Sequence, residues 1–245
     1  MKTHIVAIGG GRETLPIDRE IVRLSGKKHP KLLFIPTAND DDPRYSEYMR
    51  KLYGARLKCL FDELLLFRAR PSAADIRKKI ASADIIYVGG GNTLRMMRLW
   101  RRLGVDRLLK AAYKKGTVMC GVSAGSICWF DSGHSDSMSF YNPKQWKYVN
   151  VRGLGCIPAI HCPHFDSKTL GIPRRKNFER MIGKIGGTGI AVEDNCALHV
   201  MDGREYRVLR SKPHAKAYRV SRRKGEVVSE AVPISKKPLP LAEIL

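Results

Sequence analysis

The chain has 245 residues, of which 43% are hydrophobic and 28% are charged, a composition typical of a globular protein that buries a sizeable core. No stretch approaches the 18 apolar residues that a membrane-spanning helix needs. The opening run MKTHIVAIGGG is too short in apolar residues to predict a secretory signal. We therefore expect a cytoplasmic protein that makes no contact with a membrane.

The balance of charge is strongly basic, with 45 Lys and Arg against 23 Asp and Glu and a formal net charge of +22. Such a field attracts anions, including nucleic acid and acidic peptides. The basic residues are spread thinly, with short clusters at 101–107, 173–176 and 221–225, and no RNA- or DNA-binding motif accompanies them. This pattern favours a generally basic surface over a nucleic-acid site.

The six cysteines lie apart and form no C-x-x-C pair. Several of them fall within apolar, strand-like runs, where a reduced cysteine acts as a small hydrophobic residue. We therefore expect neither a disulfide framework nor a zinc site, and the sequence predicts no metal and no cofactor.

In chain order, strand-like apolar runs alternate with segments of helical spacing. The nearly continuous apolar character of the runs predicts a parallel sheet that is covered by helices on both faces. A doubly wound sheet of this kind places its ligand-binding loops at the carboxyl ends of the strands. The expected strands are 4–9, 31–36, 62–67, 84–90 and 117–122, and the expected helices are 17–25, 43–56, 73–82 and 93–115.

The chain continues with expected strands at 148–155, 159–165 and 189–194 and a helix at 173–186. From about residue 195 the pattern changes to short antiparallel strands, with tight turns at Asp202-Gly203 and Lys224-Gly225. No flexible linker and no internal repeat interrupts the sequence. We predict a single α/β domain over residues 1–245, in which about 195–245 form a β-rich C-terminal extension.

The stretch VMCGVSAGSICW (118–129) reads as a strand that enters a Gly-x-Ser-x-Gly turn. A serine hydroxyl becomes a strong nucleophile only with a base to take its proton and donors to stabilise the oxyanion. On a sharp strand-to-helix turn Ser123 would project, and the N–H of Ala124 would point at the developing charge. The alternative is an ordinary serine in a tight connection.

A second oxyanion donor is expected from Gly89-Gly90-Gly91, which ends a strand and precedes Asn92, an expected helix N-cap. The alternative is a phosphate-binding or purely structural turn. The segment has no P-loop lysine and no G-x-G-x-x-G pattern. The run IGGGRET (8–14) also lacks the third glycine of a dinucleotide site, so neither segment favours a nucleotide.

A histidine is needed as the base, and His164 in CPHFDS lies at the expected end of a strand. His161 lies inside the same apolar run, where a structural role is expected, and His134 is the alternative base. The acid that orients the base is assigned to Asp136 in HSDSMS. The alternative acids are Asp131, Asp166 and Glu193.

Taken in order, VGGGNT, GVSAGS with a following Ser-Asp-Ser stretch, and PHFD resemble the peptidase E family over about residues 1–200. These aspartyl dipeptidases are grouped with cyanophycinases as serine peptidases related in fold to class I glutamine amidotransferases. The resemblance implies a flavodoxin-like α/β sandwich and Ser–His–acid catalysis without a metal. It also implies hydrolysis of dipeptides or short peptides that begin with aspartate.

By position, the resemblance implies that Ser123 is the nucleophile and His164 the general base. It places the oxyanion hole at the amide of Gly90 or Gly91 together with that of Ala124. The acid of the family lies between nucleophile and histidine, which favours Asp136.

An aspartyl substrate needs a cation, and a guanidinium can hold a carboxylate through two parallel hydrogen bonds. Arg174 and Arg175 are the candidates, with Asn92 as a further substrate-binding residue; a solvated first helical turn is the alternative for the two arginines. Two other functions stay open. One is a cyanophycinase-like or other small-amide hydrolase, and the other is a catalytically idle, basic nucleic-acid-binding protein. The expected partner is a small peptide, and the sequence is compatible with a homodimer.

Overall fold

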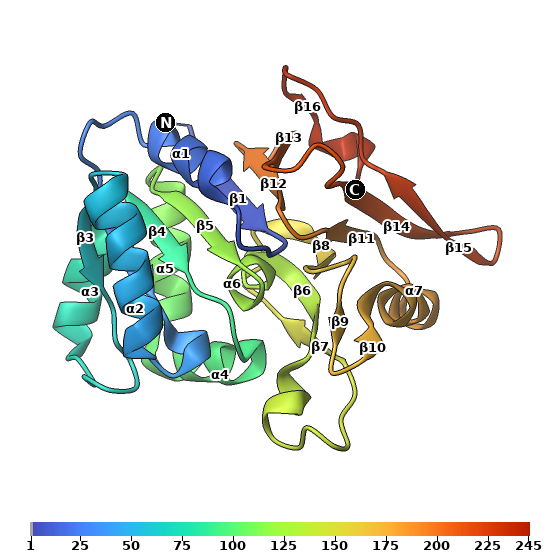
Figure 1. Cartoon of the computed structure of the whole chain (residues 1–245), viewed down its shortest axis with the longest axis horizontal. Coiled ribbons are helices and arrows are strands. Elements are labelled where there is room, and N and C mark those ends of the chain that lie inside the picture. Colours follow the sequence, from blue (N-terminus) through green and yellow to red (C-terminus); the bar gives the residue numbers. More distant parts are fainter. Residues whose placement is uncertain (1) are drawn as a thin grey trace.

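The computed structural model describes residues 2–245 and contains two large sheets that lie side by side, with helices packed around them, and a small sheet of two strands (Figure 1). The elements up to the Ser123 turn are β1 (His4–Ile8), α1 (Leu15–Leu24), β2 (Lys31–Ile35), η1 (Thr37–Asn39), α2 (Pro43–Met49), η2 (Arg50–Arg56), β3 (Leu60–Glu63), α3 (Ala73–Ser82), β4 (Ile85–Val88), α4 (Thr93–Leu103), α5 (Val105–Lys114) and β5 (Val118–Val122).

The elements after this turn form the second large sheet, the small β9–β10 sheet and the remaining strands of the first sheet. They are α6 (Ala124–Ile127), β6 (Phe130–Ser135), η3 (Ser137–Phe140), β7 (Val149–Arg152), β8 (Ile157–Cys162), β9 (Lys168–Thr169), β10 (Ile172–Pro173), α7 (Arg174–Ile185), β11 (Gly189–Val192), β12 (Cys196–Met201), β13 (Glu205–Arg210), β14 (Ala217–Arg223), β15 (Glu226–Ala231), β16 (Leu239–Pro240) and η4 (Leu241–Glu243).

The first sheet has the strand order β16-β13-β12-β1-β5-β4-β2-β3. Its strands β1, β5, β4, β2 and β3 are mutually parallel, whereas β12 and β13 add to it in antiparallel fashion. The predicted α/β fold with a mostly parallel sheet is therefore confirmed. Four of the five predicted N-terminal strands occur in it, and the fifth, predicted at 62–67, lies earlier, at Leu60–Glu63.

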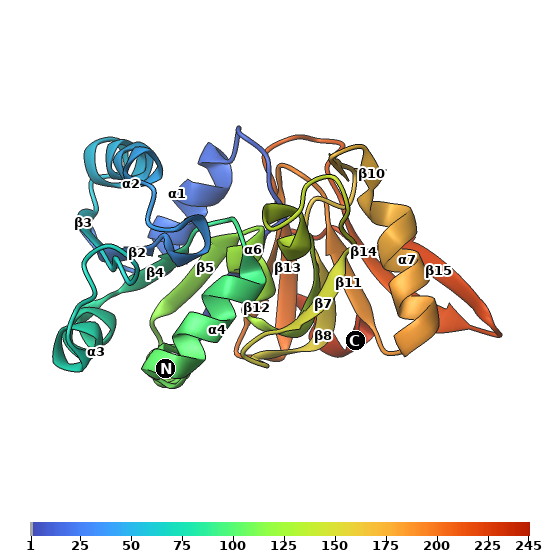
Figure 2. The ribbon, with the colours of Figure 1, turned by 90° about the horizontal axis from the view of Figure 1, so that it is seen from below.

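Burial on both faces explains why these strands are so apolar. Alternate residues of β1 point to opposite sides, so Val6 and Ile8 join the cluster that includes Ile17 of α1 and Met49 of α2. Ile5 and Ala7 of the same strand belong instead to the larger cluster with α3, α4 and α5. Figure 2 shows the helices on the two sides of this sheet.

Two of the expected helices are divided. Gly104 adopts φ 73° and ends α4, so the predicted helix 93–115 becomes α4 and α5. Glycine adopts this left-handed conformation without the strain that a side chain brings, which is why it is common just past a helix end. The predicted helix 43–56 changes at Arg50 from α-helix to the wider π-helix η2.

The second sheet has the order β15-β14-β11-β8-β6-β7. Strands β6, β8 and β11 are parallel neighbours, and α7 covers one face through Phe178 and Ile182. The sequence analysis did not predict β6, since its residues FDSGHS are mostly polar or small.

The C-terminal strands, predicted as a β-rich extension of the domain, are shared between the two large sheets. Strands β12, β13 and β16 complete the first sheet, and β14 and β15 complete the second. The predicted turns occur, with positive φ at Asp202-Gly203 and at Lys224-Gly225. One hydrophobic cluster joins both sheets, for example through Met119 of β5, Ile190 of β11 and Ala217 of β14. Among residues 2–245, the helices are all too short or too polar to span a membrane.

Candidate active site

Ser123 lies directly after β5, at the carboxyl edge of the first sheet, in an unusual backbone conformation with φ 57° and ψ −114°. Such a conformation costs a non-glycine residue about 1–3 kcal/mol and persists only where the surroundings impose it. The Ser123 amide donates to the carbonyl of Ile8 at 3.2 Å, and its carbonyl accepts from the amides of Ser126 and Ile127. The helix that follows, α6, is a single turn and so contributes little dipole.

The glycines on either side of Ser123 are required by contact with backbone atoms. A Cβ at Gly121 would lie 2.3 Å from the carbonyl oxygen of Gly125. A Cβ at Gly125 would lie 2.1 Å from the carbonyl oxygen of Val88, on the neighbouring strand β4. The Gly-x-Ser-x-Gly spacing therefore reflects close packing of the turn against β4.

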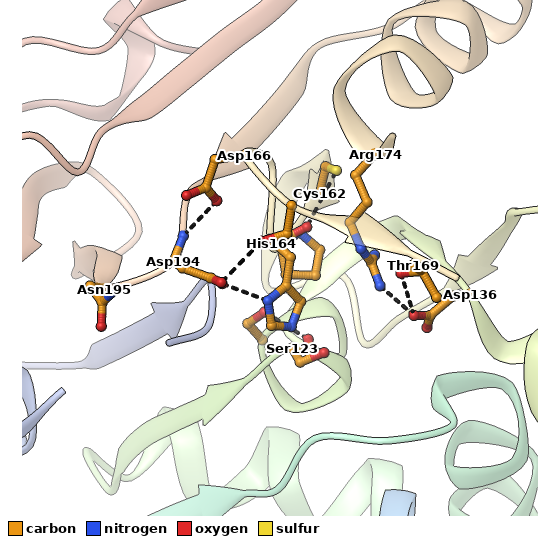
Figure 3. Close-up of polar contacts among 12 residues, drawn as sticks. Ser123, Asp136, Cys162, His164, Asp166, Thr169, Arg174, Asp194 and Asn195 are labelled. Carbon is orange, nitrogen blue, oxygen red and sulfur yellow. Dashed lines mark hydrogen bonds and ion pairs between the residues drawn. The ribbon is translucent and has the colours of Figure 1, made fainter. Parts of the chain in front are cut away.

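His164 lies after β8, the middle strand of the three parallel strands in the second sheet. Its φ is 52°, and its amide donates to the carbonyl of Gly9 at 3.2 Å. The imidazole points toward Ser123, so the two sheets bring a hydroxyl and a base together (Figure 3). The prediction that His164 stands at a strand end is confirmed.

Asp194 is the partner of this imidazole, with Oδ1 2.6 Å from His164 Nδ1. The other carboxylate oxygen accepts from the Ser167 hydroxyl at 3.0 Å, and the Asp194 amide donates to Asp166 at 2.9 Å. Burial opposes ionisation of Asp194, but the hydrogen bond and the charge of His164, helped by Ser167, outweigh burial and lower the pKa of this carboxyl. The carboxylate form is therefore favoured at neutral pH.

Gly10 allows the His164–Asp194 pair to sit against the end of β1. A Cβ at Gly10 would lie 2.2 Å from the imidazole atoms Cε1 and Nδ1 and 2.2 Å from Asp194 Oδ1. The neighbouring Gly9 is equally close to the backbone of Glu193. The first glycine run, to which the sequence assigned no role, therefore packs against the His164–Asp194 pair and leaves space for it.

Asp136 does not contact His164, so the assignment of the orienting acid to this residue was wrong. Its Oδ2 accepts hydrogen bonds from Arg174 Nη2 and from the Thr169 hydroxyl. The physical reason is position: Asp136 follows β6, on the far side of β8 from β11, and it meets the start of α7 there. Figure 3 shows the two carboxylates on opposite sides of the imidazole.

The other candidate acids are also occupied or remote. Glu193 accepts from the Tyr218 hydroxyl and the Lys216 amide, both at 2.9 Å. Asp166 accepts from the amide of Asp194, and Asp131 is exposed at the opposite end of β6 from Asp136. Asp194 was missed although it follows a buried parallel strand beside β8, which is the signal that identified His164.

Both alternative histidines are buried. His161 Nδ1 lies 2.9 Å from the carbonyl oxygen of Ile190, so this nitrogen carries the proton, and Nε2 lies 2.9 Å from the Ser126 hydroxyl. His134 Nε2 lies 3.3 Å from the Asn177 side-chain oxygen. Burial lowers the pKa of each imidazole to about 3, so both stay neutral and serve as structural residues.

The second glycine run lies beside the serine. A Cβ at Gly90 would be 3.3 Å from Ser123 Cβ and 3.9 Å from its Oγ. The Gly90 amide donates to the Tyr45 hydroxyl at 3.4 Å. Gly91 has φ 136°, and a Cβ there would lie 2.2 Å from the carbonyl oxygen of Ala38. Of the two expected donors, Gly91 is the one that lines the cavity described next.

A cavity of about 330 Å³ contains Ser123 and His164, and we call it the Ser123 cavity. Its lining is polar and carries two cations, Lys168 and Arg174, against one carboxylate, Asp136. The lining residues are Gly91, Ser123, Asp136, Phe140, His164, Ser167, Lys168, Thr169 and Arg174. Larger cavities exist, and one of about 770 Å³ lies at the amino edge of the first sheet, away from Ser123 and His164.

The expected substrate-binding residues separate into two groups. Arg174 lines the cavity, whereas Arg175 points away and stacks over the rings of Phe165 and Tyr218 at 5.0 Å. Asn92 is fully buried, caps α4 by accepting from the Arg95 amide, and donates to the Ser137 carbonyl. Its polar atoms are occupied within the protein, so a contact with substrate is not supported for Asn92 or Arg175.

No group of three or more His, Cys, Asp or Glu side chains within residues 2–245 is arranged to hold a metal ion. An α/β chain that presents a serine and an imidazole in one cavity has the chemical groups of a serine hydrolase. The sequence pattern of peptidase family S51 matches residues 5–208. The chain belongs to this family and is a serine peptidase, and the resemblance to peptidase E is confirmed.

Individual relatives agree with this assignment. The uncharacterized peptidase YgaJ of Bacillus subtilis (strain 168) is 33% identical over 239 residues, which cover 94% of this chain and 97% of the relative. Two crystal structures share the fold. One is a peptidase from an acI-B1 actinobacterium, with a TM-score of 0.74, 15% identity and 98% of each chain covered. The other is described as a peptidase E protein of Listeria monocytogenes EGD-e, with a TM-score of 0.67, 20% identity and 86% and 100% covered.

Proposed function

We propose that this serine peptidase hydrolyses dipeptides or short peptides that begin with aspartate, with Ser123 as nucleophile, His164 as general base and Asp194 as the orienting carboxylate. The observation that carries the proposal is the Ser123 cavity, in which Ser123 and His164 face each other while Asp194 holds the far side of the imidazole. The assignment of Asp194 replaces that of Asp136.

In this mechanism Asp194 fixes the tautomer of His164. A carboxylate only accepts, so His164 Nδ1 carries the proton and Nε2 is free to act as base. His164 takes the proton of the Ser123 hydroxyl as the serine oxygen attacks the peptide carbonyl. The imidazolium formed in this step is stabilised by the negative charge of Asp194.

The tetrahedral oxyanion needs donors aimed at it, and the amides of Gly91 and Ala124 are the proposed pair. When the intermediate collapses, the carbon–nitrogen bond breaks and His164 returns its proton to the leaving amine. Water then attacks the acyl-enzyme with the same base, which regenerates the Ser123 hydroxyl and releases the acid.

The charges of the cavity support an acidic substrate. Lys168 and Arg174 outnumber Asp136 among the lining side chains that lie outside the His164–Asp194 pair. Nη1 of Arg174 is buried and has no hydrogen-bond partner in the part of the chain that the structure describes. Leaving such a donor unpaired is costly, and a substrate carboxylate would be a suitable acceptor.

Removal of the serine hydroxyl tests the proposal. We expect Ser123→Ala to lower kcat on aspartyl p-nitroanilide by at least about 10³-fold, because base and oxyanion donors cannot act without the nucleophile. Ser82→Ala, an exposed serine outside the cavity, is the control and should keep full activity. A fluorophosphonate probe should label the wild type and Ser82→Ala but not Ser123→Ala.

The substrate class is tested separately with Asp-, Glu- and Ala-p-nitroanilides and the matching dipeptides. We expect the aspartyl compounds to give the highest kcat/KM. Labelling by the probe combined with equal rates on all three would keep the mechanism and contradict the preference for aspartate. A Ser123→Ala enzyme with wild-type rates would contradict the mechanism itself.

A further inference from the structure

Asp136 lines the Ser123 cavity but plays no part in orienting His164. Both of its hydrogen bonds, from Arg174 and from Thr169, are made to Oδ2. No hydrogen bond within residues 2–245 uses Oδ1, and the side chain keeps 18% of its surface exposed. The residue therefore presents one carboxylate oxygen that is available to a ligand.

The surroundings of Asp136 hold this oxygen in place. Arg174 is buried, with 4% of its side chain exposed, and its guanidinium lies 5.2 Å from the ring centre of Tyr148. The Thr169 hydroxyl binds the same carboxylate from the β9–β10 hairpin at 3.1 Å. A carboxylate fixed from two sides is preorganised, which lowers the entropy that binding would otherwise consume.

We propose that Asp136 is the receptor for the free α-ammonium group of the substrate, so that the enzyme cleaves only after an unblocked N-terminal residue. This inference rests on the proposed function of Ser123. The α-nitrogen of the first residue lies only about 2.5 Å from the carbonyl carbon that Ser123 attacks, given standard bond lengths and angles. Its partner must therefore belong to the same cavity.

Among the described residues that line this cavity, Asp136 is the sole carboxylate. An ammonium group only donates hydrogen bonds, and its strong partners are anions. Arg174 and Lys168 have the opposite charge and suit the side-chain carboxylate of an aspartyl residue. The two signs side by side match a residue that carries both a free amine and an acidic side chain.

The experiment compares aspartyl p-nitroanilide with its N-acetyl derivative, which lacks the ammonium charge. We expect the wild type to prefer the free amine by about 10–100-fold in kcat/KM, the range given by one hydrogen bond to a charged group. Asp136→Asn should lose this preference, mainly through a higher KM for the free amine, with a much smaller change in kcat/KM on the acetylated compound.

The matched control is Asp131→Asn, which removes the same charge from the exposed end of β6 and should keep the wild-type preference. Fluorophosphonate contains no amine, so its rate of labelling Ser123 should change far less in Asp136→Asn than kcat/KM for the free amine does. Labelling of the variant also shows that it is folded. Absence of labelling in the wild type would instead overturn the proposed function.

A measurement on the wild type alone keeps the proposal falsifiable if Asp136→Asn does not fold. Aspartic acid α-amide, which keeps the side-chain carboxylate, should inhibit competitively, and its N-acetyl derivative should inhibit at least about 10-fold more weakly. Equal inhibition by the two amides, or equal hydrolysis of free and acetylated substrates, would overturn the role of Asp136. An equal loss of Asp136→Asn on both substrates would do the same, since it indicates a purely structural ion pair.

Discussion

Two carboxylates lie on opposite sides of His164, and each has a different partner. Asp136 lines the Ser123 cavity, whereas Asp194 lies behind the imidazole. We call the side with Asp194 the first wall and the side with Asp136 the second wall. On the first wall Asp194 binds the imidazole of His164, which takes and returns a proton in the proposed mechanism. On the other wall Asp136 binds the guanidinium of Arg174, which stays charged. The partner therefore decides the chemistry: the first carboxylate serves proton transfer, and the second serves recognition of charge.

Both walls come from the second sheet, whereas Ser123 comes from the first. Asp136 follows β6, His164 follows β8 and Asp194 follows β11, and these three strands are parallel neighbours. A difference of two strand positions separates the carboxylate that reaches His164 from the one that reaches Arg174. The comparison predicts that variants of the first wall change kcat and variants of the second change KM.

Asp194→Asn gives the largest expected effect after loss of Ser123 itself. An amide can donate to Nδ1, which would place the imidazole proton on Nε2, where a base is needed, so we expect kcat to fall by about 10³–10⁴-fold with little change in KM. The measurement is steady-state kinetics on aspartyl p-nitroanilide. Glu193→Gln, one residue earlier and bound to Tyr218 and Lys216, is the control and should be nearly as active as the wild type.

A higher KM with unchanged kcat in Asp194→Asn would contradict this division of roles, because it would assign substrate recognition to both carboxylates.

Gly10→Ala tests the first wall through packing. The added methyl group would overlap the imidazole and Asp194 Oδ1, both 2.2 Å away, so the pair must move. A displacement of about 1 Å at a reacting group lowers the rate by about 10²-fold, and we expect this loss in kcat. Gly54→Ala is the matched control, because the nearest atom to a Cβ there is 3.4 Å away. Wild-type kcat in Gly10→Ala would contradict the proposed position of the pair.

Two neutral imidazoles are buried near the site. His161 Nε2 lies 2.9 Å from the Ser126 hydroxyl in the Ser123 turn, and His134 is stacked on Tyr148 at 4.0 Å. Burial lowers the pKa of both to about 3 from 6.5. Below pH 6.5 the unfolded chain therefore binds protons that the folded chain does not, and stability is lost as the pH falls. We expect each histidine to contribute about 2 kcal/mol of this loss between pH 7 and pH 5.

Urea unfolding at pH 7 and pH 5 measures this loss. His134→Gln should lose less stability over this range than the wild type does, because it removes one of the imidazoles that the unfolded chain protonates and the folded chain does not. An equal loss in the variant would show that His134 is protonated in the folded state.

The sequence predicted the strands that are buried on both faces, because such strands need apolar residues at every position. The strands β1, β2, β4 and β5 are buried on both faces and read as continuous apolar runs. Strand β6 was missed because four of its six residues are Ser, Asp or His, and their polar side chains break the apolar pattern by which the other strands were found.

The sequence indicated Ser123 and His164 because each follows a strand within a recognisable motif. The carboxylate was misplaced because the resemblance favoured an acid between the two, whereas the order of strands in the second sheet brings β11 next to β8. In AVEDN, Glu193 and Asp194 differ by one position, and only the backbone after β11 determines which side chain faces the imidazole.

The place of β1 in the first sheet has a consequence for synthesis on the ribosome. This earliest strand lies between β5 and β12, so one of its edges has no neighbour until residues 196–201 have emerged. An uncovered apolar edge is a template for association with other nascent chains. During most of translation, the N-terminal segment should therefore depend on chaperones, and slow elongation before residue 196 should lower the yield of native enzyme.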